Sequence, residues 1–201
     1  YDVRRLGNSA WAIINADVSG KGVSAALLAS LLQGAFLAAP HAEIPPGESM
    51  TRLNAFLLER TKGEKYATVF LGVLHRDGCL RYVNAGHGTG LLVRAHGPVE
   101  RLEPTGLPAG MIEEAEYSSG ETVLEDGDKL ILYTDGFTEA ESADGELFGE
   151  ARLRAIARQR AACSAQELFD TLDAALAAHT GGALQRDDIT FMTVEYRRRE
   201  V

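Results

Sequence analysis

Apolar residues along the chain gather in short runs that predict β-strands. The run Trp11–Ala16 is apolar and is followed directly by an acidic residue, as expected of a buried strand. Residues 66–75 and 79–84 are rich in β-branched and aromatic side chains, and the turn sequence Arg76-Asp77-Gly78 separates them. This pattern predicts a β-hairpin. A further strand is expected over residues 88–94.

The C-terminal half of the chain contains more strand-like segments. Residues 121–134 hold two of them, and the sequence Glu125-Asp126-Gly127-Asp128 between the two predicts a second hairpin. The last strand is expected over Ile189–Tyr196. Because hairpins dominate this pattern, we expect the sheets to be mainly antiparallel.

Four other segments have the pattern of helices. Residues 20–39 are small and apolar all round, which predicts a helix of about five turns that is buried on most sides. The remaining helices are expected over residues 48–61, 149–161 and 164–179. Ser164, with Glu167 three residues further on, forms the sequence of a capping box. Paired helices among antiparallel strands predict an α+β fold in which helices cover the sheets.

Composition and charge narrow the class of protein. Hydrophobic residues make up 45% of the 201 residues and charged residues 24%, as in an ordinary globular protein. The formal net charge of −9 argues against nucleic acid or an anionic membrane as partner, because both require a basic surface. The one dense basic run, Arg197–Arg199, is interpreted as a solvated tail. No apolar stretch in the sequence reaches the ~20 residues of a membrane-spanning helix.

The organisation of the chain is simple. The sequence has no internal repeat or low-complexity linker, so a single domain over residues 1–201 is expected. The chain begins at Tyr1, inside a segment that is expected to be folded. We therefore expect the chain to be part of a longer protein. Cys79 and Cys163 lie far apart without the spacing of a zinc site or a redox pair. They are predicted to be thiols in a reducing compartment, which favours a cytoplasmic location.

Aspartates stand at the ends of three predicted strands. Asp17 and Asp135 each directly follow an apolar run, and Asp187 and Asp188 directly precede the last one. Carboxylates that converge would repel one another unless a cation neutralised them. Carboxylate ligands without neighbouring His or Cys suit Mg²⁺ or Mn²⁺ rather than zinc. The alternative is that each aspartate is a turn or cap residue, and their spacing alone does not prove a shared site.

Two other motifs have weaker implications. Ser19-Gly20-Lys21-Gly22 precedes a predicted helix, but it is not the nucleotide-binding P-loop because Gly22 follows the lysine where that motif has Ser or Thr. A tight turn with a solvated lysine is the simpler interpretation, and no kinase signature is present. His87 stands in a glycine-rich turn between strands. It is either a polar turn residue or a residue with a catalytic or substrate-binding role.

Four segments together resemble a known family. They begin at Asp17 (DVSGKGVSAALL), Tyr82 (YVNAGH), Leu132 (LYTDGFTEA) and Arg186 (RDDIT). In this order they resemble the bacterial stage II sporulation E (SpoIIE/RsbU-type) phosphatases, a branch of the PPM family of metal-dependent protein phosphatases. The resemblance runs from residue 1 to about residue 196, nearly the whole chain. Four motifs in register make it specific.

The resemblance implies a fold and a metal site. The fold would be a four-layer α-β-β-α sandwich with two central, mainly antiparallel sheets and a two-metal site between them at one end. Asp17 and the backbone carbonyl of Val18 would hold one Mn²⁺ or Mg²⁺ ion. Asp135 would hold or bridge to the other ion, Asp187 would complete the site, and Asp188 would support the turn. The helix over residues 22–39 resembles the family's regulatory helix.

The resemblance also implies an activity and partners. The chain would be a serine/threonine protein phosphatase in which a metal-activated water, and no protein nucleophile, attacks the phosphorus. The expected substrate is a phosphoprotein, such as an anti-sigma-factor antagonist, and the expected regulator is an upstream sensor or receiver domain. The family has a further metal-binding aspartate, in Gly-Gly-Asp, before the position of Tyr1, and Asp2 does not match it.

A second hypothesis belongs to a different class of protein. A catalytically weak, phosphatase-like scaffold would bind a signalling partner and lack the upstream ligand. The aspartates at positions 17, 135 and 187 favour the enzyme. The apolar helix at 20–39 could serve a homodimer or an interface between domains, although burial on the domain's own sheet is the simpler expectation.

Overall fold

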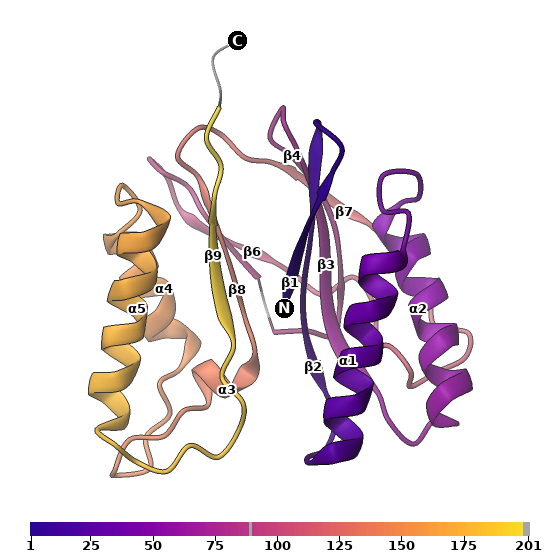
Figure 1. Cartoon of the computed structure of the whole chain (residues 1–201). Helices are drawn as coiled ribbons and strands as arrows, with labels where there is room; N and C mark the ends of the chain where they lie inside the picture. Colours follow the sequence, from indigo (N-terminus) through magenta and orange to yellow (C-terminus); the bar gives the residue numbers. More distant parts are fainter. Residues whose placement is uncertain (89, 199–201) are drawn as a thin grey trace. The chain divides into compact units, whose positions relative to one another are not determined.

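The computed structural model describes residues 1–88 and 90–198. The chain divides into two compact units, and each is described here by itself. The first unit comprises Tyr1–His87 and Glu103–Val123, and the second comprises Gly88–Leu102 and Leu124–Val201. Each unit contains one antiparallel sheet with helices packed on it (Figure 1). The prediction of an α+β protein with antiparallel sheets is therefore confirmed.

The sheet of the first unit has five strands in the order β1-β2-β3-β4-β7. Their bounds are β1 Asp2–Leu6, β2 Ala10–Val18, β3 Ala67–His75, β4 Cys79–Ala85 and β7 Gly120–Val123. All neighbouring strands are antiparallel. The predicted hairpin of β3 and β4 is confirmed, and its turn contains Gly78 at a φ of 90°, a conformation that glycine adopts without steric cost.

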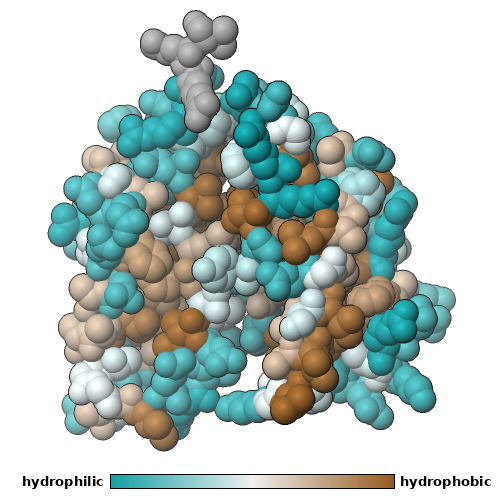
Figure 2. Space-filling model, viewed as in Figure 1, coloured by the Kyte–Doolittle hydropathy of each residue, from teal (hydrophilic) through white to brown (hydrophobic). Residues whose placement is uncertain are grey.

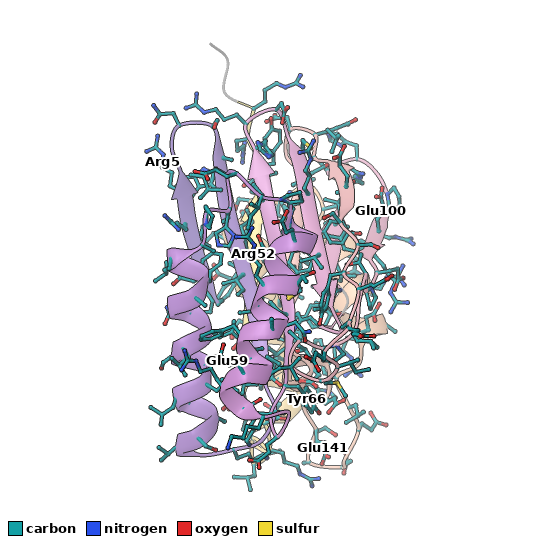
Figure 3. All side chains as sticks on the ribbon, turned by 90° about the vertical axis from the view of Figure 1, so that its right-hand side faces the viewer. Arg5, Arg52, Glu59, Tyr66, Glu100 and Glu141 are labelled. Atoms are coloured by element: carbon teal, nitrogen blue, oxygen red, sulfur yellow. The ribbon has the colours of Figure 1, made fainter. Side chains whose placement is uncertain are left out.

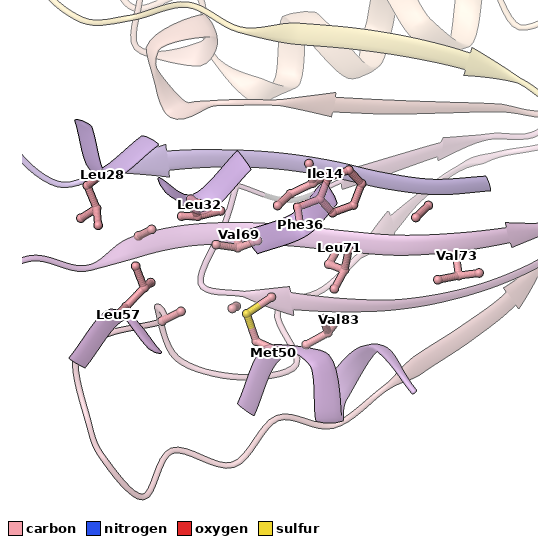
Figure 4. Packing of buried hydrophobic residues seen from close by; sticks show 14 of the residues in the cluster. Ile14, Leu28, Leu32, Phe36, Met50, Leu57, Val69, Leu71, Val73 and Val83 are labelled. Carbon is pink, nitrogen blue, oxygen red and sulfur yellow. The ribbon is translucent and has the colours of Figure 1, made fainter. Parts of the chain in front are cut away.

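Helices α1 (Val23–Ala38) and α2 (Pro46–Thr61) run side by side over one face of this sheet (Figure 3). The buried residues of α1 are Leu28, Leu32 and Phe36, which recur every fourth position and so form one stripe. Alternate strand residues such as Ile14 and Leu71 face this stripe, because successive side chains of a strand point to opposite faces (Figure 4). The core of the first unit lies between this helix pair and the sheet.

The exposure of α1 differs from the sequence-based expectation. Burial on most sides was predicted, but Val23 is 77% exposed and Leu27 is 62% exposed, with Leu31 and Leu37 also at the surface. Figure 2 shows hydrophobic, brown residues gathered along the position that α1 has in Figure 1. The prediction was wrong because a helix that lies flat on a sheet buries only one stripe, whatever the hydrophobicity of its other sides. We call the residues Val23, Leu27 and Leu31 the α1 patch.

The sheet of the second unit has four strands in the order β6-β5-β8-β9. Their bounds are β5 Gly90–Val93, β6 Val99–Leu102, β8 Lys129–Tyr133 and β9 Phe191–Glu195. The helices of this unit are α3 Asp135–Thr138, α4 Glu150–Gln159 and α5 Ala165–Thr180. Residues of α4 and α5, such as Leu153 and Leu172, pack with Leu91 and Ile131 of the sheet. None of the helices in the described ranges is long and apolar enough to cross a membrane.

The second hairpin predicted from the sequence does not form. Residues Glu125–Asp128 make a turn, closed by a 2.9 Å hydrogen bond from Asp128 N–H to the Glu125 carbonyl. The strands on either side of it nevertheless belong to different sheets, because β7 pairs with β4 and β8 pairs with β5 and β9. A turn sequence specifies the local backbone conformation, whereas the partners of a strand are chosen by long-range contacts.

The capping box at the start of α5 is confirmed and makes a testable prediction. The Ser164 hydroxyl accepts from the Glu167 N–H, and the Glu167 carboxylate accepts from the Ser164 N–H. Ser164→Ala is expected to lower the Tm by about 2–4 °C, because it removes the side-chain acceptor for a helix N–H. Differential scanning calorimetry measures the change, with Ser118→Ala at an exposed loop position as control. An equal effect of both substitutions would contradict the prediction.

Candidate metal centre

Asp17 lies near the end of β2 in the first unit, where it pairs across the sheet with Thr68 of β3. Directly opposed residues of antiparallel strands point to the same face, so the two side chains are neighbours. The next segment is bound to the start of β3. The Ser19 hydroxyl accepts from the Tyr66 N–H at 3.0 Å, and the Ser19 carbonyl accepts from the Lys65 ammonium at 3.1 Å. Asp17 therefore projects from an anchored strand end.

The ladder between β2 and β3 also orients the carbonyl of Val18. The Ser19 N–H donates to the Tyr66 carbonyl at 2.9 Å, so these two residues form a hydrogen-bonded pair. Such pairs alternate with non-hydrogen-bonded pairs along an antiparallel ladder. Val18 and Ala67, one step away, therefore form a non-hydrogen-bonded pair. The Val18 carbonyl points away from β3, toward an edge where the pairing of β2 with β1 has already ended.

His87 lies in the same unit and contacts the cross-strand neighbour of Asp17. Its Nδ1 atom is 2.9 Å from the Thr68 hydroxyl, and its backbone N–H donates to the Asn84 side-chain oxygen at 2.9 Å. The residue is 2% exposed. Gly86, at a φ of 63°, permits this turn, and a Cβ there would lie 2.6 Å from the Pro108 ring. This environment favours a positioning role for His87 over a solvent-exposed turn position.

Asp135 and Asp187 are brought together in the second unit. Asp135 is the first residue of α3 and is separated from the end of β8 by Thr134 alone, and Asp187 precedes β9, which pairs with β8. Thr134 links the two segments. Its N–H donates to the Thr190 carbonyl at 2.9 Å, and its hydroxyl donates to the Asp188 carbonyl at 3.2 Å and accepts from the Thr190 N–H at 3.0 Å. The end of β8 and the segment before β9 are thereby held side by side.

Gly136 allows the close approach of these segments. A Cβ at this position would collide with the carbonyl oxygen of Asp188 and would lie 3.6 Å from the Cβ of Asp187. Only a glycine therefore fits between Asp135 and the backbone of the facing segment without displacing it. The close approach is a feature that sequence reasoning missed, as it missed the role of Thr134. A glycine after an aspartate is common in turns, so the sequence contained no signal that separated the two interpretations.

The two carboxylates of the second unit are suited to bind a cation. One oxygen of Asp135 accepts from the Gly136 N–H at 2.9 Å, and one oxygen of Asp187 accepts from the Asp188 N–H at 2.9 Å. Within residues 1–88 and 90–198, the second oxygen of each has no hydrogen-bond partner, and both residues are exposed. Mg²⁺ is commonly held by one or two carboxylates together with water. The donor set therefore fits a hard divalent cation.

Among residues 1–88 and 90–198, the structure does not assemble a larger ligand cluster. In the described part of the chain, no three His, Cys, Asp or Glu side chains are grouped so that they could hold a metal ion. Asp135 and Asp187 belong to the second unit, and Asp17 and Val18 belong to the first. The complete ligand set that the resemblance implies therefore remains a prediction.

A substitution at Gly136 tests the geometry of the pair. Gly136→Ala is expected to weaken Mn²⁺ binding by about 10–100-fold, because the added methyl group must push the Asp187–Asp188 segment away from Asp135. Isothermal titration calorimetry measures the affinity. Gly34→Ala is a matched control, since Gly34 is also helical and a Cβ there would meet no atom within 4 Å. Unchanged Mn²⁺ affinity in Gly136→Ala would show that the pair does not bind the ion.

Comparison with known proteins establishes the family. The model of the family described as Stage II sporulation protein E (SpoIIE) matches residues 7–197, so the chain belongs to the SpoIIE family. Protein IcfG of Synechocystis is 31% identical over 96% of the chain and 35% of its own length. The phosphoserine phosphatase RsbU of Bacillus subtilis is 29% identical over 78% of the chain and 47% of its own length. The chain thus spans less than half of these curated relatives.

Solved structures establish the fold. The SiaA-PP2C domain of Pseudomonas aeruginosa superposes with a TM-score of 0.85 at 23% identity, covering 97% of this chain and 79% of that domain. A structure of RsbX in complex with magnesium has a TM-score of 0.69 at 17% identity and covers 94% of this chain and 82% of RsbX. The chain therefore has the fold of the PP2C, or PPM, phosphatase domains, as the resemblance implied.

Proposed function

We propose that this chain is a metal-dependent serine/threonine protein phosphatase that acts on a phosphoprotein in bacterial signalling. The observation that carries the proposal is the pair of Asp135 and Asp187, which Thr134 and Gly136 hold together in a chain of the SpoIIE family. The named activity of RsbU, a phosphoserine phosphatase, supports the same reaction class. The known homologues therefore favour hydrolysis of a phosphoric monoester.

The proposed ligand set comprises four groups. Asp17 and the carbonyl of Val18 would hold one Mn²⁺ or Mg²⁺ ion, and Asp135 and Asp187 would hold a second one. The orientation of the Val18 carbonyl, which points away from β3, supports this set. The paired carboxylates of Asp135 and Asp187 in the second unit also support it. Two such ions, when bound, lower the pKa of a coordinated water and neutralise charge on the phosphoryl oxygens.

The side chains around these ligands have positioning roles. Thr134 holds the Asp188 backbone and so limits the movement of Asp187 relative to Asp135. His87 holds Thr68, which lies beside Asp17. These contacts reduce the reorganisation needed when charge develops on the substrate, which is how preorganised sites accelerate reactions. No side chain of the chain is required as a covalent nucleophile in this mechanism.

Hydrolysis of para-nitrophenyl phosphate tests the proposed activity. We expect turnover with Mn²⁺ or Mg²⁺ and none with a chelator. The same assay on a chain lengthened at its N-terminus by a segment with the family's Gly-Gly-Asp motif tests whether that aspartate is needed. Absence of metal-dependent turnover in both chains would reject the phosphatase. Turnover in the longer chain alone would show that the ligand set needs the upstream aspartate.

The proposed substrate is phosphoserine or phosphothreonine on a protein, such as an anti-sigma-factor antagonist in the cytoplasm. An upstream sensor or receiver domain would regulate the reaction. Phosphate release from a phosphorylated antagonist, compared with release from free phosphoserine, measures the preference. Equal kcat/KM for the two would contradict a protein substrate.

A scaffold that binds a signalling partner is the second candidate, and the α1 patch favours it. Exposed apolar patches on soluble proteins commonly mark interaction sites. If the patch forms a homodimer, Leu31→Lys is expected to shift the chain toward monomer, because it places a charge among apolar side chains. Sedimentation velocity measures the shift, with Gln33→Lys on the same helix as control. A monomeric wild-type chain would contradict the homodimer.

A further inference from the structure

A basic side chain lies next to the pair of Asp135 and Asp187. Arg186 directly precedes Asp187, and its Nη1 atom forms a 2.9 Å ion pair with the Glu141 carboxylate within the second unit. Glu141, which is labelled in Figure 3, belongs to the segment that begins at Asp135. The Arg186 side chain therefore reaches from the segment of one proposed ligand to the segment of the other.

Hydrogen bonds keep Glu141 near Asp135. Helix α3 has four residues, and the Glu139 N–H donates to the Asp135 carbonyl at 2.8 Å. Glu141 is two residues further on, so its Cα lies at most about 7 Å from the Cα of Glu139. Glu141 also forms a β-bridge with Leu147, which fixes its backbone. The carboxylate that pairs with Arg186 is thus held close to the proposed ligand pair.

The two segments are otherwise acidic. The side chains at positions 135, 139, 141, 187 and 188 are carboxylates, and Arg186 is the one basic residue in the sequence of 135–141 and 185–188. A phosphorylated serine carries a charge of about −1.5 to −2 at pH 7. Carboxylates that no cation neutralises repel such a group. A guanidinium at the same place opposes this repulsion and attracts the phosphoryl group.

The ion pair of Arg186 with Glu141 is weak enough to be exchanged. The Arg186 side chain is 73% exposed and that of Glu141 is 25% exposed. Exposed ion pairs contribute little to stability, because water and salt screen them. A guanidinium binds a phosphoryl group more strongly, since two parallel N–H groups can donate to its charged oxygens. We therefore expect a phosphoryl group to displace the Glu141 carboxylate.

We propose that Arg186 binds the phosphoryl group of the substrate and that it leaves Glu141 to do so. The inference rests on the proposed function, because it assigns a substrate-binding residue of that same site. Arg186 donates hydrogen bonds to the phosphoryl oxygens and stabilises their charge. It forms no covalent bond and accepts no proton, so the reaction with the metal-activated water is unchanged.

Kinetics of Arg186→Ala test this role. We expect KM for para-nitrophenyl phosphate and the inhibition constant of inorganic phosphate to rise at least about 10-fold, because a hydrogen bond to a charged group is lost. The value of kcat should fall by a smaller factor than KM rises. Arg186→Lys keeps a point charge without the planar fork and should have a smaller effect on both constants. Unchanged constants in the folded Arg186→Ala variant would overturn the proposal.

The affinity for Mn²⁺ separates substrate binding from a structural role. Titration calorimetry should give the wild-type Mn²⁺ affinity for Arg186→Ala, because Asp135 and Asp187 are retained. If the Mn²⁺ affinity falls as far as KM rises, Arg186 only positions Asp187, and the proposal is overturned.

Arg197→Ala is the matched control for the loss of one positive charge. Arg197 also forms a 2.9 Å ion pair, with Glu195, and its side chain is 67% exposed. This substitution is expected to leave KM and the phosphate inhibition constant unchanged. An equal effect of Arg197→Ala and Arg186→Ala would reduce the result to net charge and overturn the proposal.

Phosphate binding separates this inference from the proposed function, since it needs no turnover. Inorganic phosphate is titrated into the chain in the presence of Mg²⁺ and followed by calorimetry. Binding that is lost in Arg186→Ala, in a chain without turnover, would reject the phosphatase and keep Arg186 as a phosphate-binding residue. Turnover together with phosphate binding that does not depend on Arg186 would overturn this inference alone. Absence of both turnover and phosphate binding would reject both.

Discussion

Asp135→Asn is expected to lower kcat/KM for metal-dependent hydrolysis of para-nitrophenyl phosphate by at least about 100-fold. The asparagine side chain has the same size, and its carbonyl oxygen can still accept from the Gly136 N–H, as the Asp135 carboxylate does at 2.9 Å. What is lost is the negative charge of the exposed oxygen, which a divalent cation requires. The fold should therefore be preserved while metal binding and turnover fall together.

The controls separate this effect from a general loss of charge or stability. Asp144→Asn removes an exposed carboxylate in a turn of the same unit and is expected to leave kcat/KM unchanged. Asp187→Asn is expected to resemble Asp135→Asn, whereas Asp188→Asn is expected to have a smaller effect. Calorimetric titration with Mn²⁺ and the Tm of each variant accompany the kinetics. Wild-type turnover in Asp135→Asn with Mn²⁺ would remove this residue from the proposed site.

Of the substitutions named above and below, Asp128→Ala is expected to lower the free energy of unfolding most. Asp128 is 2% exposed. Its carboxylate accepts from the Arg94 guanidinium at 2.8 Å and from the Ala95 and Glu125 N–H groups at 2.9 Å. Alanine would leave these backbone donors and part of the guanidinium without a partner. Removal of one member of such a buried charged network costs about 3–5 kcal/mol of unfolding free energy. Urea denaturation followed by circular dichroism measures the loss.

The same carboxylate makes a pH-dependent contribution. Burial alone would raise the pKa of Asp128, but the Glu125 and Ala95 N–H groups and Arg94 outweigh it, and the pKa is lowered. A lowered carboxyl pKa means that the unfolded chain binds the proton more readily than the folded one. The contribution is therefore complete above about pH 4, the unfolded pKa, and declines as the pH falls through the folded pKa.

Comparison with Asp128→Asn isolates this contribution. Asparagine keeps an acceptor for the neighbouring N–H groups but cannot titrate. The unfolding free energy of the Asp128→Asn variant should therefore lack the part of the loss at low pH that comes from protonation of Asp128. The stability advantage of wild type over Asp128→Asn should thus shrink below about pH 4. Arg94→Lys, which keeps the positive charge near Asp128, is the matched control for the partner. A constant difference between wild type and Asp128→Asn at every pH would contradict the assigned cause.

Local patterns in the sequence predicted much of the secondary structure. The hairpin of β3 and β4 and the capping box at Ser164 are confirmed because both depend on residues close together along the chain. The motifs beginning at Asp17 and Leu132 identified the family, since motifs in register are a property of the sequence alone. The positions of the aspartates next to the predicted strands were likewise found from the local sequence pattern.

Tertiary structure decided the features that depend on distant contacts. The turn at Glu125–Asp128 forms as its sequence predicts, yet β7 and β8 join different sheets, because strand pairing is chosen by long-range packing. The α1 patch is exposed because composition does not specify which sides of a helix are covered. The Thr134 link between Asp135 and Asp187 joins residues more than 50 positions apart, and no local pattern can encode such a contact.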